Sequence, residues 1–134
     1  MDYPSLKIEL TKRSESNPDI VGLAIAGSYV RNTQKPDSDI DVCLFVSNPD
    51  QFISNPCWAE FFGGIQSTKI EDWGVVKTLR VFYKHGPEVE FNFSTLAWAD
   101  IPVDPGTHRV VADGIDILYD PTERLSTLQH HVCA

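Results

Sequence analysis

The chain has 134 residues, a length that suits one domain around one core, which we place over residues 1–134. Its composition, with 42% hydrophobic and 22% charged residues, is typical of a soluble globular protein. The formal net charge of −8, without a cluster of basic residues, argues against nucleic-acid binding. No apolar run approaches the roughly 18 residues of a membrane-spanning helix, and the N-terminus lacks a secretion-signal pattern. Three cysteines without a CxxC spacing fit a reducing compartment, so we expect a cytoplasmic protein.

The first third of the chain predicts a helix followed by two strands. Residues 4–14 carry leucines four apart and predict a helix, which the Asn-Pro-Asp sequence at 17–19 ends. Residues 20–26 form a nearly all-apolar run, which is typical of a buried strand. A short helix is expected at 29–32, where its first backbone N–H groups can face phosphates. Residues 40–46 predict a second strand, with an apolar face and a face that carries aspartates.

The middle of the chain predicts a broken helix and a β-hairpin. A helix begins near Asp50, is interrupted by Pro56 and resumes with aromatic residues at helical spacing. The pattern at 68–72 favours neither a helix nor a strand. Residues 75–83 and 88–93 alternate in polarity on either side of a Lys-His-Gly-Pro turn, which predicts two antiparallel strands.

The C-terminal third predicts short elements. Residues 94–98 suit a short helix, and two apolar segments at 110–111 and 115–119 flank a turn. A final helix, capped by Thr122, is expected to reach Leu128. Because strands alternate with helical stretches and the hairpin requires antiparallel pairing, the fold class is α/β (α+β), a mixed sheet with helices packed on one side.

A motif before the second strand suits a metal-bound nucleotide. Gly27-Ser28 is followed, after ten residues, by Asp39-Ile40-Asp41. Both aspartates point the same way, roughly 6.5 Å apart along the strand, and bare carboxylates that close repel each other. A divalent cation removes that conflict, and Mg²⁺ commonly binds one or two carboxylates together with substrate phosphates. Gly27 lets the backbone approach a ligand and Ser28 adds a hydroxyl, so the motif predicts a site for a metal-bound nucleoside triphosphate.

This motif resembles the signature of the nucleotidyltransferase superfamily that includes DNA polymerase beta, and its spacing matches small bacterial members. Ser38 stands where these members often carry Ser before the first Asp. Arg31 falls where the short helix after Gly-Ser often carries Arg, whereas Asn32 stands where Gly is commoner. The resemblance implies a polymerase beta-like palm fold.

The resemblance also implies a third carboxylate, on a strand that lies beside the Asp-x-Asp strand and follows a hairpin. Glu90, flanked by Val89 and Phe91, fits this description best. Glu88 lies on the same strand face but nearer the turn, so it is the second choice.

The stretch from residue 50 to residue 120 is similar to aminoglycoside 6-adenylyltransferases. Those proteins follow the Asp-x-Asp strand with a helix that contains Trp and Phe and ends near Gly, and then with a hairpin that bears the third acid. They continue into a helical C-terminal domain that helps to bind the antibiotic, and this sequence stops before one. The identity of the acceptor therefore stays open.

The resemblance implies transfer of a nucleoside monophosphate, with ATP as the favoured donor and Mg²⁺ or Mn²⁺ as the cation. The expected catalytic and metal-binding residues are Asp39, Asp41 and Glu90. The expected nucleotide-binding residues are Gly27, Ser28, Arg31 and Ser38. An aminoglycoside-like small molecule is the first choice of acceptor. The alternatives are a minimal nucleotidyltransferase antitoxin that modifies or binds a helical partner of the HEPN type, and a nucleotide-binding module without catalysis.

Association is a further expectation. A domain of this size without a helical companion is expected to leave apolar area uncovered, and therefore to form a homo-oligomer or a heteromer. The candidates for this uncovered area are Trp58, Phe61, Phe62 and Trp98.

Overall fold

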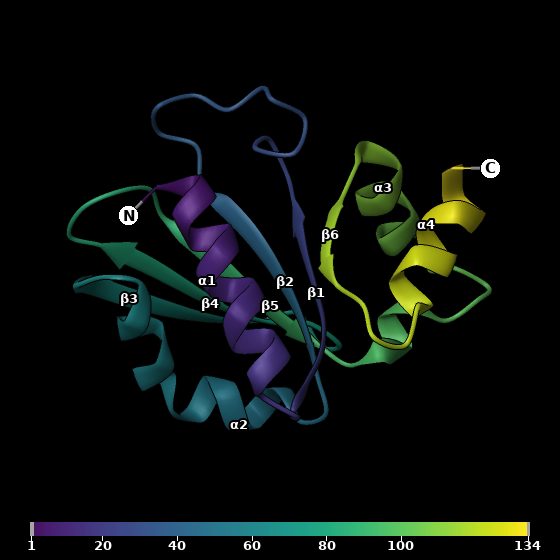
Figure 1. Ribbon diagram of the computed structural model, residues 1–134, viewed down its shortest axis with the longest axis horizontal. Helices are drawn as coiled ribbons and strands as arrows, with labels where there is room; N and C mark the ends of the chain where they lie inside the picture. Colours follow the sequence, from purple (N-terminus) through teal and green to yellow (C-terminus); the bar gives the residue numbers. More distant parts are fainter. Residues whose placement is uncertain (1, 134) are drawn as a thin grey trace.

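The computed structural model describes residues 2–133 and builds them around one mixed, six-stranded sheet (Figure 1). Its strands are β1 Ile20–Ala26, β2 Ile40–Val46, β3 Ile65–Asp72, β4 Lys77–Tyr83, β5 Val89–Ser94 and β6 Asp116–Tyr119. Across the sheet they follow the order β3-β4-β5-β2-β1-β6. Strands β2 and β5 pair in parallel, and the other neighbours pair antiparallel. The mixed sheet predicted from the sequence is thus confirmed.

Within these residues, four α-helices and two 3-10 helices surround the sheet. They are α1 Tyr3–Ser16, α2 Pro49–Ser54, α3 Pro105–Asp113, α4 Arg124–Cys133, η1 Pro56–Phe62 and η2 Leu96–Ala99. Side-chain caps mark where α1 and α3 begin. At α1, Asp2 accepts a hydrogen bond of 2.8 Å from the Ser5 backbone N–H. At α3, Asp104 accepts hydrogen bonds from the backbone N–H groups of Gly106 and Thr107. These bonds satisfy amides that have no partner in the first helical turn, so they fix where each helix begins.

One face of the sheet carries the larger hydrophobic core. Alternate residues of β2 and β5 point to this face, as the sequence predicts, and they pack beneath α1, α2 and η1. The central members of this core are Ile40, Val42, Leu44, Val46, Val89, Phe91 and Phe93. Figure 1 shows α1 running across the sheet on this side. The polar residues of the same two strands therefore point to the opposite face.

The opposite face is divided between a second core and a polar area. At the β1 and β2 end, Phe45 packs with Val111 of α3 and with Leu125 and Leu128 of α4. Figure 1 shows these two helices grouped beside β6. Helices thus cover both faces, and the prediction that they pack on one side is wrong, because the C-terminal helices bring apolar residues of their own. The rest of this face, over β5 and β4, carries polar side chains.

Several local predictions are wrong. Residues 29–32 form turns rather than a helix, because Asn32 has a φ of 56° in the left-handed region, which ends the helical path. Residues 68–72, for which the sequence favoured neither a helix nor a strand, belong to the edge strand β3. Val110 and Val111 lie in α3 rather than in a separate apolar segment, and α4 continues to Cys133.

The apolar side chains that solvent reaches differ from those expected. Phe61 is 63% exposed, but Phe62 is buried, and Trp58 is half-buried with its indole N–H bonded to a backbone carbonyl. The other large exposed apolar residues of β3, β4 and the turn between them are Ile70, Trp73, Val75 and Phe82. Association therefore stays a prediction, and the exposed apolar residues lie largely elsewhere than expected. Among the described residues, no helix is both long and apolar enough to cross a bilayer.

Candidate active site

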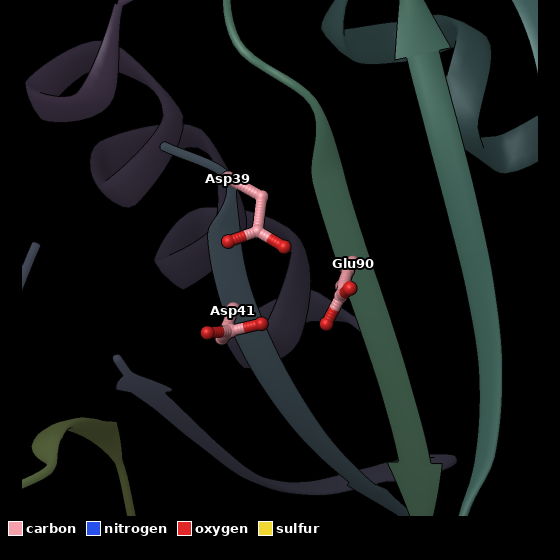
Figure 2. A group of neighbouring side chains, drawn as sticks. All are labelled: Asp39, Asp41 and Glu90. Atoms are coloured by element: carbon pink, nitrogen blue, oxygen red, sulfur yellow. The ribbon is translucent and has the colours of Figure 1, made fainter. Parts of the chain in front are cut away.

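Three carboxylates meet where β2 and β5 run side by side (Figure 2). Asp39 directly precedes β2, Asp41 lies within it, and the parallel register pairs Asp41 with Glu90 of β5. One carboxylate oxygen of each residue lies within 4.8 Å of the corresponding oxygens of the other two. We call these three residues the acidic triad. The position expected for Glu90 beside the aspartates is the one observed, and Glu88 lies outside the triad.

Crowding and burial raise the pKa values of the triad. Burial, followed by hydrogen bonding to Glu90, raises the pKa of Asp39 to about 6. Burial, followed by hydrogen bonding to Asp41, raises the pKa of Glu90 to about 7, and burial also raises the pKa of Asp41. Without a cation, the triad therefore retains protons near neutral pH. Three clustered carboxylate oxygens are hard donors that fit Mg²⁺ or Mn²⁺, which would take the place of those protons.

Gly27 packs against the triad. The β1–β2 register pairs Ala26 with Asp41, so the next residue of the chain lies over the Asp41 side chain. Gly27 has a φ of 84°, and a Cβ at this position would lie 2.3 Å from Asp41 Oδ2. A side chain here would displace the carboxylate, so only glycine is compatible with this arrangement. The sequence predicted that Gly27 lets the backbone approach a ligand. In the structure, the group that the Gly27 backbone approaches closely is the Asp41 carboxylate.

The serines of the motif make contacts within the loop that connects β1 and β2. The Ser28 carbonyl accepts a hydrogen bond of 3.0 Å from the Thr33 backbone N–H. Ser38 Oγ accepts one of 2.8 Å from the Lys35 backbone N–H. These bonds shape the loop that leads into the aspartates, so Ser38 has a structural contact that the sequence did not indicate.

A cavity of about 420 Å³ adjoins the triad on the same sheet face. Its lining includes Gly27, Arg31 and Asp41, together with Trp98 of η2 and Val110 of α3. The volume lies within the range of small-molecule pockets. Arg31, which was singled out from the sequence, therefore lines a cavity next to the triad.

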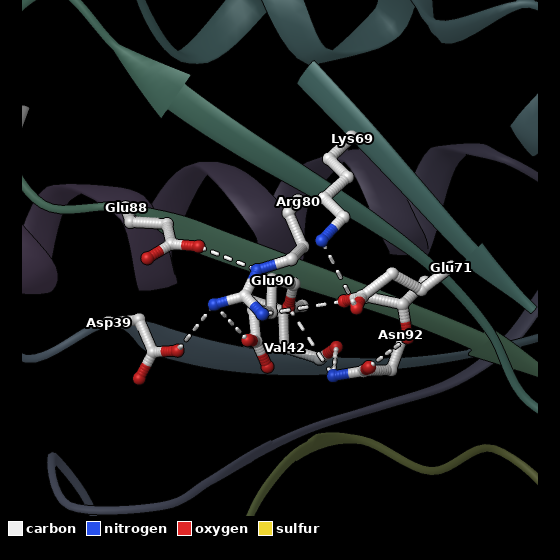
Figure 3. A network of polar contacts seen from close by, with 9 residues as sticks. Asp39, Val42, Lys69, Glu71, Arg80, Glu88, Glu90 and Asn92 are labelled. Atoms are coloured by element: carbon white, nitrogen blue, oxygen red, sulfur yellow. Dashed lines mark hydrogen bonds and ion pairs between the residues drawn. The ribbon is translucent and has the colours of Figure 1, made fainter. Parts of the chain in front are cut away.

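Arg80 of β4 reaches the same cluster, and the sequence analysis missed it (Figure 3). Its Nη2 lies 2.9 Å from Glu90 Oε1 and 3.9 Å from Asp39 Oδ2, and its Nε lies 2.8 Å from Glu88 Oε1. The hairpin register pairs Arg80 directly with Glu90. The signal in the sequence was the hairpin itself, because alternation and a short turn place these two residues opposite each other.

Three carboxylates gathered on a mixed sheet beside a Gly-Ser turn form a donor set that could hold a divalent cation next to a phosphate group. Residues 7–91 match the family model described as nucleotidyltransferase domain, and this match spans more than half of the chain. The chain therefore belongs to the nucleotidyltransferase domain family. This membership confirms the nucleotidyltransferase family expected from the Gly-Ser and Asp-x-Asp motif.

A solved structure has the same fold. The chain resembles an aminoglycoside 6-adenyltransferase from Bacillus subtilis with a TM-score of 0.54 and 16% sequence identity. The alignment covers 70% of this chain and 35% of that protein, so the chain spans about a third of the neighbour's length. No curated protein sequence matches the chain. The similarity supports the nucleotidyltransferase fold and leaves the substrate to be inferred from the site.

Proposed function

We propose that the domain transfers AMP from ATP to a hydroxyl group of a small molecule and releases pyrophosphate. The observation that carries this proposal is the convergence of the acidic triad beside Gly27. Asp39, Asp41 and Glu90 would hold Mg²⁺ or Mn²⁺, which supplies charge neutralisation for the attacking and leaving oxygens of an in-line displacement.

The chain's own groups bind and orient the substrates. Backbone N–H groups and the hydroxyl at Gly27-Ser28 bind the β- and γ-phosphates, and Arg31 supplies a positive charge in the adjoining cavity. The cavity gives the nucleotide space beside Asp41. Glu90 completes the metal site or takes the proton of the attacking hydroxyl group.

The charge around the triad favours a cationic acceptor. Glu71 and Glu88 add two carboxylates beside the triad, and both contact Arg80. Arg80 and Lys69 offset only part of this negative charge. An amine-bearing alcohol, such as an aminoglycoside, matches this surface, because its ammonium groups gain from the carboxylates while a hydroxyl approaches the triad.

Calorimetry with ATP tests the metal-dependent site. We expect ATP to bind at least about tenfold more tightly with Mg²⁺ than with EDTA, because the cation offsets repulsion between the triphosphate and the triad. Asp41→Asn should abolish this difference, whereas the exposed Asp37→Asn serves as a matched control and should retain it. Equal ATP affinity with Mg²⁺ and with EDTA in the unmodified protein would remove the proposal. Pyrophosphate release in the presence of amine-bearing and uncharged alcohols then tests the acceptor class.

We also propose that the domain works in the cytoplasm and associates with a second copy or a helical partner. The free cysteines support a reducing compartment, and the exposed apolar residues of β3 and β4 support association. Light scattering at tens of micromolar, with a pulldown, tests association, and a monomer without a partner would contradict it.

A further inference from the structure

Arg80 joins two pairs of carboxylates through one guanidinium group (Figure 3). Toward the triad, its Nη2 contacts Glu90 Oε1 at 2.9 Å and Asp39 Oδ2 at 3.9 Å. Away from the triad, its Nε contacts Glu88 Oε1 at 2.8 Å and its Nη1 contacts Glu71 Oε1 at 3.4 Å. The guanidinium thus shares its charge between the triad and an outer pair, Glu71 and Glu88, that belongs to no metal-binding group in the described chain.

The sheet holds Arg80 in this position. Its strand, β4, lies between β3 and β5, and the registers pair Arg80 with Lys69 on one side and Glu90 on the other. Its side chain is 29% exposed, which leaves it partly shielded from solvent. Arginine presents donors in a rigid planar fork, so different edges of one group can contact Glu88 and Glu90 at the same time.

We propose that Arg80 is a positioning residue that acts as a built-in counter-ion of the acidic triad and lowers its affinity for a divalent cation. It holds Glu90 Oε1 toward β4, and its positive charge offsets part of the negative potential that would attract a cation. The outer pair, Glu71 and Glu88, draws the guanidinium away from the triad and thereby favours cation binding. This inference rests on the proposed metal site.

Titration with Mn²⁺ alone, followed by electron paramagnetic resonance of the free ion, tests the proposal without nucleotide or turnover. Arg80→Met keeps much of the side-chain length and removes the charge, so it should bind Mn²⁺ about tenfold more tightly at low salt. Arg80→Lys keeps the charge but cannot contact Glu88 and Glu90 through one planar fork, so its affinity should lie between those of the unmodified protein and Arg80→Met. Lys69→Met is the matched control, because it removes a cation from the same face that contacts Glu71 and not the triad, and it should change affinity little.

Glu88→Gln provides a second test that leaves Arg80 in place. Loss of this outer carboxylate should shift the guanidinium toward the triad and weaken Mn²⁺ binding about threefold. In the Arg80→Met background the same change should have no effect, because no guanidinium remains to be shifted. Unchanged or weaker binding by a folded Arg80→Met protein overturns the inference, as does a Glu88→Gln effect that is equal in both backgrounds. If Arg80→Met does not fold, an unchanged Mn²⁺ affinity in Glu88→Gln alone overturns it. Absence of Mn²⁺ binding by the unmodified protein would instead remove the metal site of the proposed function, and the inference with it.

Discussion

Replacement of Glu90 by Gln separates the third carboxylate of the triad from its neighbour on the same strand. Gln keeps the shape of the side chain and removes the charge that binds a cation or accepts a proton. Glu88 lies two residues away on the same face, and a two-residue step moves a side chain about 6.5 Å along the strand. This step exceeds a Mg–O bond of about 2.1 Å, so the two carboxylates cannot take the same place at one ion.

The expected magnitudes differ between the two variants. Glu90→Gln should lower turnover on the order of 10² to 10⁴, which is about 3 to 5 kcal/mol of barrier. Glu88→Gln removes one of several partners of a partly exposed Arg80, a contact worth about 1 kcal/mol or less. Its turnover at saturating Mg²⁺ should therefore stay within about fivefold of the unmodified protein.

The stability of the metal-free protein provides a control against unfolding. Burial raises the pKa of Glu90 from 4.5 to about 7. Since a difference of one pKa unit corresponds to about 1.4 kcal/mol, the ionised Glu90 side chain destabilises the fold by at most about 3 kcal/mol. Because its side chain is 21% exposed and solvent screens part of the effect, we expect Glu90→Gln to raise the free energy of unfolding by about 1 to 2 kcal/mol at pH 8. The variant should therefore lose activity without losing stability.

The assay is single-turnover pyrophosphate release at saturating Mg²⁺ and acceptor, alongside denaturant unfolding of the metal-free proteins. A crippled Glu88→Gln beside a near-normal Glu90→Gln would refute the assignment of the third carboxylate. Glu90→Gln that is both inactive and strongly destabilised would refute the argument that its carboxylate is crowded and partly protonated.

Two further predictions concern the surroundings of the triad. Gly27→Ala should abolish Mg²⁺-dependent ATP binding, because its Cβ would clash with Asp41 Oδ2. Gly74→Ala is the control: Gly74 has a similar φ of 86° but open space around it, so this variant should lose only about 1 kcal/mol of stability and keep ATP binding. Calorimetry and thermal unfolding compare the two, and equal ATP binding by both variants would contradict the predicted clash. Folding raises the pKa values of Asp39 and Glu90 to about 6 and 7, so the metal-free fold is stabilised by their protonated forms. This stabilisation is fully present below about pH 4 and is lost as the pH rises through 6 and 7. Mn²⁺ must displace these protons at low pH, so its stabilising shift in Tm should be larger at pH 8 than at pH 5.5, and the reverse order in thermal scans would contradict this reasoning.

The central strands could be predicted from the sequence because they obey one simple rule. In β5 and in the first half of β2 the residues alternate with period two, so the pattern there separates the core residues from Asp41 and Glu90. The Gly-Ser turn before the aspartates added the family resemblance, which supplied the third carboxylate. The adjacency of Glu90 and Asp41 depends on strand order, and no local pattern in the sequence encodes that order.

The elements that were missed lack such a pattern. Most residues of the edge strand β3 are exposed, so no alternation marks it. Helix α3 begins with Pro105, which suits a first helical position, but Gly106 is a poor helix former, and the start depends on the Asp104 cap. Arg80 was overlooked because its role comes from cross-strand pairing with Glu90 rather than from its neighbours in the chain.

The parallel pairing of β2 with β5 has a consequence for folding. Asp41 and Glu90 become neighbours only after the chain from residue 47 to residue 88 has formed a closed loop, which is a costly, non-local step. A slip of one residue in this register would place Val89 or Phe91 opposite Asp41 and turn Glu90 toward the hydrophobic core. We therefore expect cation binding to be regained late in refolding, once β2 and β5 have paired in the correct register.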